Sequence, residues 1–228
     1  MFAGSAPYAG FIATRCATQA GSGSRGAAHT CPPLRRMTQA LLSASALSVG
    51  RGDRVLIDGL CLDVAAGEVV HLRGRNGVGK TSLLEVLAGL RPALSGTVAR
   101  EALHWLGHRN GLTPSLSVLQ NLQFWCGLNG AAEARISPAL ERLGLYRLRH
   151  RDARTLSAGQ KRRSALARLL VSPRPLWLLD EPLSGLDAGG LALFGELMQA
   201  HVAGGGAALV TSHQPLPVVA VALRSVDL

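Results

Sequence analysis

Apolar and polar positions follow two different periods along this chain from residue 40 onward. Residues 40–49 alternate loosely and residues 55–64 repeat the pattern after a turn at 51–54, so both are predicted strands. Shorter apolar runs bounded by turn residues predict buried strands at 68–72, 103–106, 176–179 and 207–211. Helical spacing predicts helices at 80–90, 158–171 and 191–203 and a mostly helical region at 118–149. This alternation predicts an α/β fold, with helices on both faces of a largely parallel sheet.

The composition agrees with an ordered domain. Hydrophobic residues make up 47% of the 228 residues and charged residues 17%, which suffices for a substantial core. No apolar run approaches the roughly 18 residues that a membrane span requires, so a role at a membrane needs a partner protein. The four scattered cysteines form no CxxC pair, which predicts reduced thiols instead of a metal site or a disulfide framework.

The chain is basic, with 24 Lys and Arg against 14 Asp and Glu and a net charge of +10. The densest segment runs from Arg142 to Arg168 and holds nine basic residues and one acid, Asp152. Three interpretations remain open: a solvated basic face, a contact with an anionic membrane surface, and a nucleic-acid site. No aromatic platform is interleaved with these charges, and aromatics are only 4% of the chain, so no nucleic-acid partner is expected.

Residues 1–36 differ from the rest of the chain. They contain Arg15, Arg25, Arg35 and Arg36, no acid and mostly small residues. The segment fits an over-extended translation start before Met37, an organelle transit peptide or a disordered tail. Under each alternative we expect residues 1–36 to stand outside the fold, as a disordered leader, and residues 37–228 to form the domain.

Residues 74–81 carry the strongest chemical signal. Their sequence, GRNGVGKT, fits the phosphate-loop pattern G-x-x-x-x-G-K-[ST], and it lies between a predicted strand and a predicted helix. The glycines let backbone N–H groups surround phosphate oxygens, and the helix N-terminus adds its positive dipole end. Lys80 is expected to reach the β- and γ-phosphates and Thr81 to offer its hydroxyl to Mg²⁺. The predicted ATP-binding residues are Gly74, Arg75, Asn76, Gly77, Val78, Gly79, Lys80, Thr81 and Ser82.

A pair of carboxylates follows the apolar strand at 176–179. Asp180 and Glu181 stand where the strand ends, and buried carboxylates at such a place are costly without a cation. In a phosphate-loop protein the first acid holds Mg²⁺, so Asp180 is the predicted metal ligand with Thr81. Glu181 is then placed to polarise the attacking water, which makes it the predicted catalytic base.

A third segment, LSAGQ at residues 156–160, begins a basic helix. Ser157 is able to cap that helix, and Gly159 permits the close approach of an anion. Its position between the phosphate loop and Asp180 resembles the LSGGQ signature of ABC ATPases. The resemblance continues with residues 184–187 (SGLD), which are similar to the D-loop with Asp187, and with His213, which is similar to the switch histidine that senses the γ-phosphate.

The resemblance covers residues 40–228 and implies a more detailed picture. It implies a P-loop NTPase of the ABC type, with an antiparallel N-terminal β subdomain and a small helical subdomain at about 113–158. It also implies that ATP lies between two copies of the chain, where Ser157, Gly159 and Gln160 contact the ATP of the partner copy. Glu181 and His213 are then the catalytic residues, and ATP and Mg²⁺ the implied substrate and metal.

Flanking residues favour one branch of this family. Segments such as WLGH at 105–108, LSAGQKRR at 156–163 and TSHQPL at 211–216 resemble the ATP-binding subunits of cytochrome c maturation systems, the heme exporter ATPases. This resemblance implies ATP hydrolysis that drives a separate integral membrane subunit. It also implies a peripheral location on the cytoplasmic face of the inner membrane, or in an organelle if the leader is a transit peptide.

Two positions depart from the family pattern. The glutamine of the Q-loop would fall at Arg109, and a guanidinium neither accepts a hydrogen bond nor ligates Mg²⁺. The aromatic residue that stacks on adenine is missing, and Arg51 stands near its place; a guanidinium stacks on any base, so weak base selectivity is expected.

Other functions remain as alternatives. The chain fits the ATPase subunit of another small ABC transporter, and Arg109 keeps open a nucleotide-binding regulatory module with weak hydrolysis. A soluble ABC protein that acts on nucleic acid or ribosomes is disfavoured, because such proteins usually carry two cassettes or a long coiled-coil insertion. This chain has a single cassette and no heptads.

Overall fold

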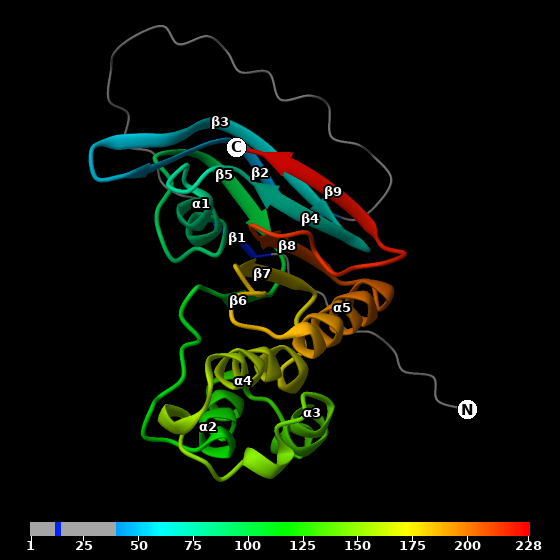
Figure 1. Cartoon of the computed structure of the whole chain (residues 1–228). Helices are drawn as coiled ribbons and strands as arrows, with labels where there is room; N and C mark the ends of the chain where they lie inside the picture. Colours follow the sequence, from blue (N-terminus) through cyan, green and yellow to red (C-terminus); the bar gives the residue numbers. More distant parts are fainter. Residues whose placement is uncertain (1–11, 15–39) are drawn as a thin grey trace, which may run out of the picture.

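Two β-sheets of opposite character form the scaffold (Figure 1). The computed structural model describes residues 12–14 and 40–228. In the antiparallel sheet the strand order is β1-β5-β2-β3, and in the parallel sheet it is β6-β7-β8-β4-β9. The antiparallel strands are β1 (Ile12–Thr14), β2 (Ala40–Arg51), β3 (Arg54–Ala65) and β5 (Ser95–Arg100). The parallel strands are β4 (Glu68–Arg73), β6 (Leu103–Leu106), β7 (Leu176–Asp180), β8 (Ala207–Thr211) and β9 (Ala222–Asp227).

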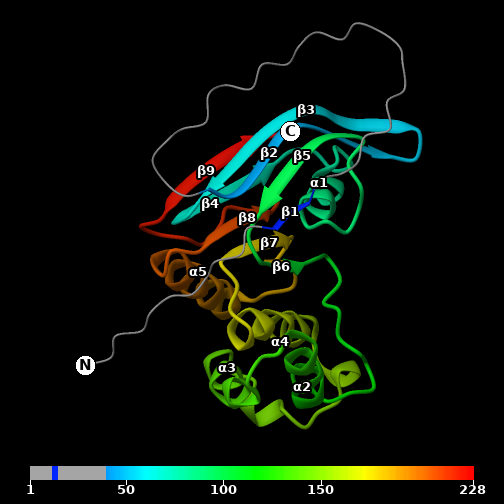
Figure 2. The same ribbon diagram turned by 180° about the vertical axis from the view of Figure 1, so that it is seen from behind.

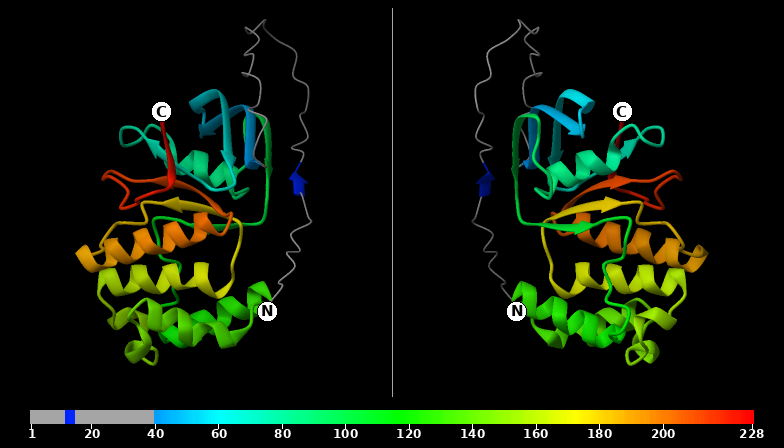
Figure 3. Two further views of the ribbon diagram at one scale, coloured as in Figure 1. Left: turned by 90° about the vertical axis from the view of Figure 1, so that its right-hand side faces the viewer. Right: turned by 90° about the vertical axis from the view of Figure 1, so that its left-hand side faces the viewer.

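Helices cover both faces of the parallel sheet, as the alternating pattern predicts. Helix α1 lies on the side of the antiparallel sheet, and on the other side α5, α4 and then α2 follow in successive layers (Figure 3). The helices are α1 (Lys80–Leu87), α2 (Val118–Asn129), α3 (Ile136–Arg142), α4 (Ala158–Val171) and α5 (Ala188–Ala203). Short 3₁₀ turns are η1 (Glu133–Arg135), η2 (Tyr146–Leu148) and η3 (Ala153–Thr155).

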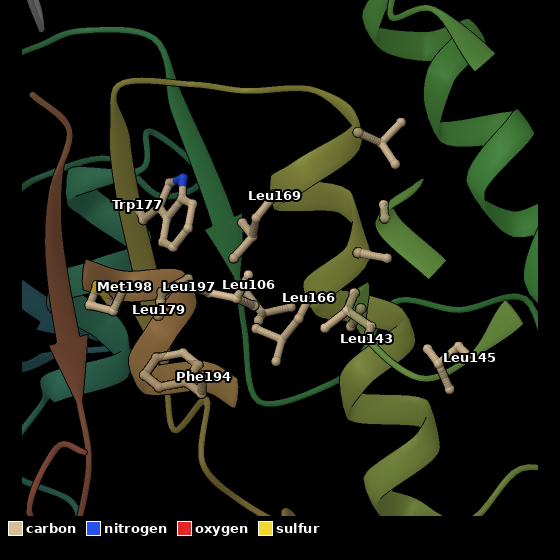
Figure 4. Close-up of a cluster of buried hydrophobic side chains, with 14 of the residues drawn as sticks. Leu106, Leu143, Leu145, Leu166, Leu169, Trp177, Leu179, Phe194, Leu197 and Met198 are labelled. Atoms are coloured by element: carbon tan, nitrogen blue, oxygen red, sulfur yellow. The ribbon is translucent and has the colours of Figure 1, made fainter. Parts of the chain in front are cut away.

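Strand β7 shows why the sheet is apolar on both faces. Leu176 and Leu178 pack into the core that contains α1, whereas Trp177 and Leu179 pack into the core beneath α4 and α5. Successive side chains of a strand point to opposite faces, so a strand covered on both sides is a continuous apolar run. Figure 4 shows the second core, in which Trp177 and Leu179 meet Phe194, Leu197 and Met198 of α5 and Leu166 and Leu169 of α4.

The region predicted as mostly helical between 118 and 149 is broken into short pieces. Gly130 ends α2 in the left-handed conformation, with φ 60°, and Gly144 follows α3 with φ 65°. A left-handed glycine is the usual helix terminator, because it has no Cβ to clash. Helices α2, α3 and α4 lie together away from the antiparallel sheet, as the view from behind also shows (Figure 2).

The predicted α/β architecture is confirmed, but three strands were not predicted: β1, β5 and β9. β5 carries Gly96 at its start and few apolar residues, and β9 is an edge strand with mostly exposed side chains. Neither has the periodicity that marks a buried strand. Helix α1 also ends earlier than predicted, at Leu87, because Gly89 adopts φ 74° before Pro92 is reached.

The leader is only partly within the described residues. Ile12–Thr14 form β1, which pairs with β5, so these three residues depart from the expectation that the whole leader stands outside the fold. The remainder of 1–36 lies outside the described residues, and the domain boundary at Met37 stays a prediction. Cys126 is a buried free thiol as expected, whereas Cys61 forms a disulfide, which corrects the expectation of reduced thiols throughout.

Within the part of the chain that the structure describes, none of the helices combines the length and the apolarity needed to cross a membrane.

Candidate nucleotide-binding and hydrolysis site

The carboxyl ends of three adjacent parallel strands bring the predicted residues together. Strands β7, β8 and β4 are neighbours in the sheet, and the chain leaves them at Asp180, Thr211 and Arg73. Parallel strands end at the same edge, and open α/β sheets bind ligands in the crevice beyond that edge. The phosphate loop, the carboxylate pair and His213 follow these three strands directly, so residues more than 100 positions apart share one site.

The phosphate loop wraps around the side chain of Lys80. Its Nζ donates to the carbonyl oxygens of Gly74 at 2.7 Å and Arg75 at 3.1 Å, and Lys80 is 9% exposed. Gly79 precedes α1 with φ 116°, and a Cβ there would lie 3.1 Å from Cβ of Leu56. This conformation suits glycine alone and leaves the first N–H groups of α1 free to face an anion.

Asp180 lies at the centre of the site and is 2% exposed. Thr81 Oγ1 donates to its Oδ2 at 2.9 Å, and Thr211 Oγ1 donates to its Oδ1 at 2.7 Å. The second bond follows from the register, in which Asp180 and Thr211 are direct partners. The carboxylate and the Thr81 hydroxyl therefore sit side by side, and such oxygens are the ligands that Mg²⁺ prefers.

This donor set fits Mg²⁺ better than a metal held by protein alone. The described residues contain no group of three or more His, Cys, Asp or Glu side chains arranged to hold a metal. Mg²⁺ usually binds through one or two carboxylates and completes its shell with substrate phosphates and water. The Asp180 carboxylate and the Thr81 hydroxyl, which lie beside the phosphate loop, match this binding preference of Mg²⁺.

Glu181 has an unusual backbone conformation. Its φ is 49°, and its N–H donates to Thr211 Oγ1 at 2.9 Å. Its Oε1 is buried without a hydrogen-bond partner and lies 3.4 Å from Nε2 of His213. The Glu181 side chain is 20% exposed and that of His213 is 56% exposed, so this carboxylate faces a solvent-accessible edge next to the imidazole. A carboxylate beside an open cleft is able to accept a proton from a water molecule in that cleft.

An open cleft of about 440 Å³ joins these groups, within the usual size range of small-molecule sites. It is lined by Asn76, Gly77, Gly79, Lys80, Thr81, Ser82, Asp180, Glu181 and His213, together with Arg51, Arg54 and Leu56. Arg51 is thus placed at the nucleotide cleft, where the family's aromatic residue is missing. Sequence reasoning missed Arg54, although the two arginines are direct partners across the turn from β2 to β3.

The signature residues lie elsewhere. Ser157 caps α4 through a reciprocal pair of bonds, because its Oγ accepts from Gln160 N at 3.2 Å and its N–H donates to Gln160 Oε1 at 3.0 Å. Gly159 packs on the D-loop, where an added Cβ would lie 2.8 Å from the carbonyl oxygen of Gly185. Asp187 caps α5 by accepting from Gly190 N at 2.8 Å. The cleft of the same chain is not lined by any of the predicted signature and D-loop residues, which are Ser157, Gly159, Gln160 and Asp187.

The loop after β6 holds the two residues at the expected Q-loop position. Arg109 is exposed and does not line the cleft. Its neighbour Asn110 accepts a hydrogen bond at its Oδ1 from Nη1 of Arg162, at 3.0 Å. Arg109 therefore stands at the Q-loop position in the sequence, but in the structure Asn110 makes the inward contact.

Comparisons with known proteins show the family of this chain. The family model described as ABC transporter matches residues 57–184. The chain is 49% identical over 175 residues to the cytochrome c biogenesis ATP-binding export protein CcmA of Rhodobacter capsulatus, covering 76% of this chain and 81% of that protein. It is 47% identical over 197 residues to the protein of the same name from Methylococcus capsulatus, covering 80% and 95%.

A solved structure of an ATP-binding subunit of an ABC transporter superposes with a TM-score of 0.70. The two chains are 26% identical, and the match covers 76% of this chain and 79% of the other. The arrangement of the two sheets and the helices is therefore shared with that subunit.

Proposed function

The chain belongs to the ABC transporter family and, within it, to the ATP-binding export proteins of cytochrome c biogenesis, and on this premise we propose how its residues bind and hydrolyse ATP. It is an ABC-type ATPase of the heme exporter class. The observation that carries the assignment of residues is the contact network in which Thr81, Asp180 and Thr211 join the phosphate loop to two strand ends.

The phosphate loop, from Gly74 to Ser82, holds the triphosphate. Its N–H groups and the start of α1 face the phosphates, and Lys80 exchanges its two carbonyl partners for β- and γ-phosphate oxygens when ATP enters. A charged donor bound to a phosphate is stronger than one bound to neutral carbonyls, which favours this exchange. Arg51 and Arg54 line the remaining part of the cleft and contact the base and ribose end of the nucleotide.

Thr81 and Asp180 are the residues that would hold Mg²⁺. The adjacent hydroxyl and carboxylate support this role, and the ion, when bound, offsets the charge of the β- and γ-phosphates. Thr211 supports the site from the other side, because its hydroxyl bonds to Asp180 and keeps the carboxylate turned toward Thr81.

Glu181 is the general base for hydrolysis. A water oxygen attacks the γ-phosphorus in line with the bridging oxygen, the bond from phosphorus to that oxygen breaks, and ADP leaves. The water proton passes to the carboxylate of Glu181, a residue that lines the cleft. His213 lies 3.4 Å from the same oxygen and is placed to sense the γ-phosphate and to orient the carboxylate.

Ser157, Gly159 and Gln160 act on the ATP of a second copy. Ser157 and Gly159 stand at the capped N-terminus of α4 and are absent from the cleft of their own chain, which supports a head-to-tail dimer with two sandwiched nucleotides. A helix N-terminus binds an anion favourably, so the start of α4 suits a γ-phosphate. Asp187, at the start of α5, lies on the neighbouring D-loop.

The hydrolysis cycle drives a separate integral membrane subunit in c-type cytochrome biogenesis. This chain then associates with the cytoplasmic face of the inner membrane through that subunit. No nucleic-acid partner is part of the proposal.

Replacement of the gene by a Glu181→Gln form in the native organism tests this function. We expect c-type cytochromes with attached heme to disappear from the membranes while b-type cytochromes remain, as measured by heme staining and difference spectra. The wild-type chain restores them and co-purifies with the membrane subunit. Normal c-type cytochromes in the Glu181→Gln cells would contradict the proposal.

A further inference from the structure

Arg162 is a buried cation that the proposed mechanism leaves unexplained. It lies on α4, five positions after Ser157, and is 2% exposed. Among the described residues no carboxylate lies within ion-pair distance of its guanidinium. Burial lowers the pKa of Arg162 to about 10, although the charges of Asp180 and Glu181 raise it. Burying a cation in this way is costly and requires compensating hydrogen bonds.

Those bonds converge on the strand end that carries the base. Nη2 of Arg162 donates to the carbonyl oxygens of Asp180 at 2.9 Å and Glu181 at 2.6 Å, and Nε donates to that of Pro182 at 3.0 Å. Three consecutive carbonyls are thus held by one planar group. A guanidinium suits this arrangement because its donors have a fixed fork geometry.

The other side of the fork reaches the loop after β6. Nη1 donates to the carbonyl oxygen of Gly107 at 3.1 Å and to Oδ1 of Asn110 at 3.0 Å. Arg162 therefore joins three elements that are far apart in the sequence: helix α4, which Ser157 caps, the loop that carries Arg109, and the end of β7.

The conformation of Glu181 explains why such support is needed. A φ of 49° in a residue with a side chain costs about 1–3 kcal/mol and persists only where the surroundings hold it. Thr211 accepts the N–H of Glu181, and Arg162 donates to its carbonyl oxygen, so the residue is held at both ends.

We propose that Arg162 is a positioning residue for hydrolysis, which holds the backbone of Glu181 and couples it to α4 and to the loop at Gly107 and Asn110. The inference rests on the proposed role of Glu181 as the base. Movement of α4 or of that loop changes the hydrogen bonds of Arg162 and thereby the direction of the Glu181 carboxylate. Arg162 touches neither nucleotide nor water in this account, and it acts through Glu181.

The test compares Arg162→Lys with wild type in the isolated full chain. Lysine keeps the positive charge but cannot reproduce five bonds from a planar fork, so the Glu181 carboxylate loses its direction. We expect kcat per nucleotide-binding site to fall about 10²-fold, the scale of a misplacement of about 1 Å, and KM for ATP to change by less than about threefold. The number of sites is measured by titration with a fluorescent ATP analogue, so loss of folded protein is counted separately.

Two further variants serve as controls. Arg163→Lys changes the next residue of α4, whose Nη1 donates to the carbonyl oxygen of Leu143 at 3.3 Å and does not contact Glu181. It should keep kcat per site within about twofold. Asn110→Ala removes one acceptor of the fork and leaves Arg162 in place, so it should lower kcat several-fold with KM unchanged, even if Arg162→Lys fails to fold.

A double mutant separates the inference from the proposed function. Because Arg162 acts through Glu181, Arg162→Lys should lower kcat by less than about threefold further in a Glu181→Gln background. A further 10²-fold loss of kcat when Arg162→Lys is added to Glu181→Gln would overturn the inference and leave Glu181 as the base. Wild-type kcat per site in both Arg162→Lys and Asn110→Ala would do the same. Wild-type turnover in Glu181→Gln alone would instead overturn the base role.

Discussion

The cleft edge and the start of α4 differ in how their polar groups are satisfied. At the cleft edge, Thr81 is bonded to Asp180 across 99 positions of sequence, and Asp180 is bonded to Thr211 on the next strand. At the start of α4, Ser157 is bonded to Gln160, three positions away, and the pair is exposed. Long-range contacts make the first a preassembled site, whereas local contacts make the second a capped helix end that the fold leaves facing outward.

This difference predicts two kinds of defect. A change at the cleft edge should impair a single copy of the chain, since the groups it needs are already in place. A change at the start of α4 should leave nucleotide binding by one copy intact and appear only where two copies meet.

Lys80→Ala should have the largest effect. It removes the charge that faces the β- and γ-phosphates, so MgATP affinity should fall about 10²-fold, or about 3 kcal/mol, and hydrolysis should stop. Isothermal titration of the isolated chain measures the affinity. Lys161→Ala is a matched control, because Lys161 is the other lysine of the chain and contacts the carbonyl oxygen of Arg154 at 3.3 Å, away from the cleft. Equal affinity in Lys80→Ala and wild type would refute the site.

Glu181→Gln should retain ATP binding and slow hydrolysis by at least about 10²-fold, the scale of a lost general base. The unhydrolysed ATP should also trap the head-to-tail dimer. Phosphate release measures the rate, and size-exclusion chromatography with ATP measures the dimer. Glu196→Gln, an exposed position on α5, serves as the control. If Glu181→Gln stayed monomeric at every ATP concentration, that result would argue against the head-to-tail dimer with sandwiched ATP in the isolated subunit.

Gly159→Ala should separate the two regions most cleanly. The new Cβ would meet the carbonyl oxygen of Gly185 at 2.8 Å and crowd the helix end offered to the partner's γ-phosphate. Turnover should fall about tenfold or more while the affinity of one copy for ATP stays unchanged. Gly189→Ala is the control, because its Cβ meets nothing nearer than Asp187 Oδ1 at 3.9 Å. Weaker ATP binding by monomeric Gly159→Ala would contradict the proposal that the start of α4 acts only where two copies meet.

Arg51→Ala should have a smaller effect at the base end of the cleft. Stacking of a guanidinium on a base contributes about 0.5–1 kcal/mol and does not distinguish purines, so affinity for ATP and GTP should fall together, about threefold. Wild type itself should prefer ATP over GTP by less than about tenfold. Competition binding measures both, with the exposed Arg135→Ala as the control. A strong preference for ATP that Arg51→Ala removes would show a specific contact instead.

Arg109→Gln should have the smallest effect. Arg109 is exposed and outside the cleft, so the isolated chain should change little. In the complex with the membrane subunit, if the loop moves and brings residue 109 close to the Mg²⁺ position, removal of its positive charge should raise turnover about twofold and lower the Mg²⁺ concentration for half-maximal rate. Steady-state rates against Mg²⁺ concentration decide this. Slower turnover would indicate that Arg109 serves the phosphate.

The successes of sequence analysis share a physical cause. The phosphate loop needs glycines at defined positions, the end of β7 needs an apolar run before its carboxylates, and the capping box at Ser157 needs Gln160 three residues later. Each requirement is met within about ten residues, so it leaves a local pattern. The buried strands were found for the same reason, since a strand covered on both faces is apolar at every position.

The failures share a cause as well. β9 is exposed and pairs only with β4, and β5 owes its place to β2 and β1, so their own side chains carry little signal. Arg54 and Arg162 were missed because a single arginine in an arginine-rich chain has no distinguishing pattern. They are recognised only in the folded structure, where Arg54 lines the cleft and Arg162 contacts the carbonyl oxygens of Asp180 and Glu181.

The amino-acid order by itself thus determined the family, and it carried the predictions for the phosphate loop and for Glu181 as the base, because these depend on residues that are close along the chain. Only the tertiary structure decided that Asp180 meets Thr81 and Thr211, that Asn110 and not Arg109 faces inward, and that Arg162 holds Glu181. Those contacts depend on strand order, register and the burial of a cation, which are settled when distant segments pack against each other.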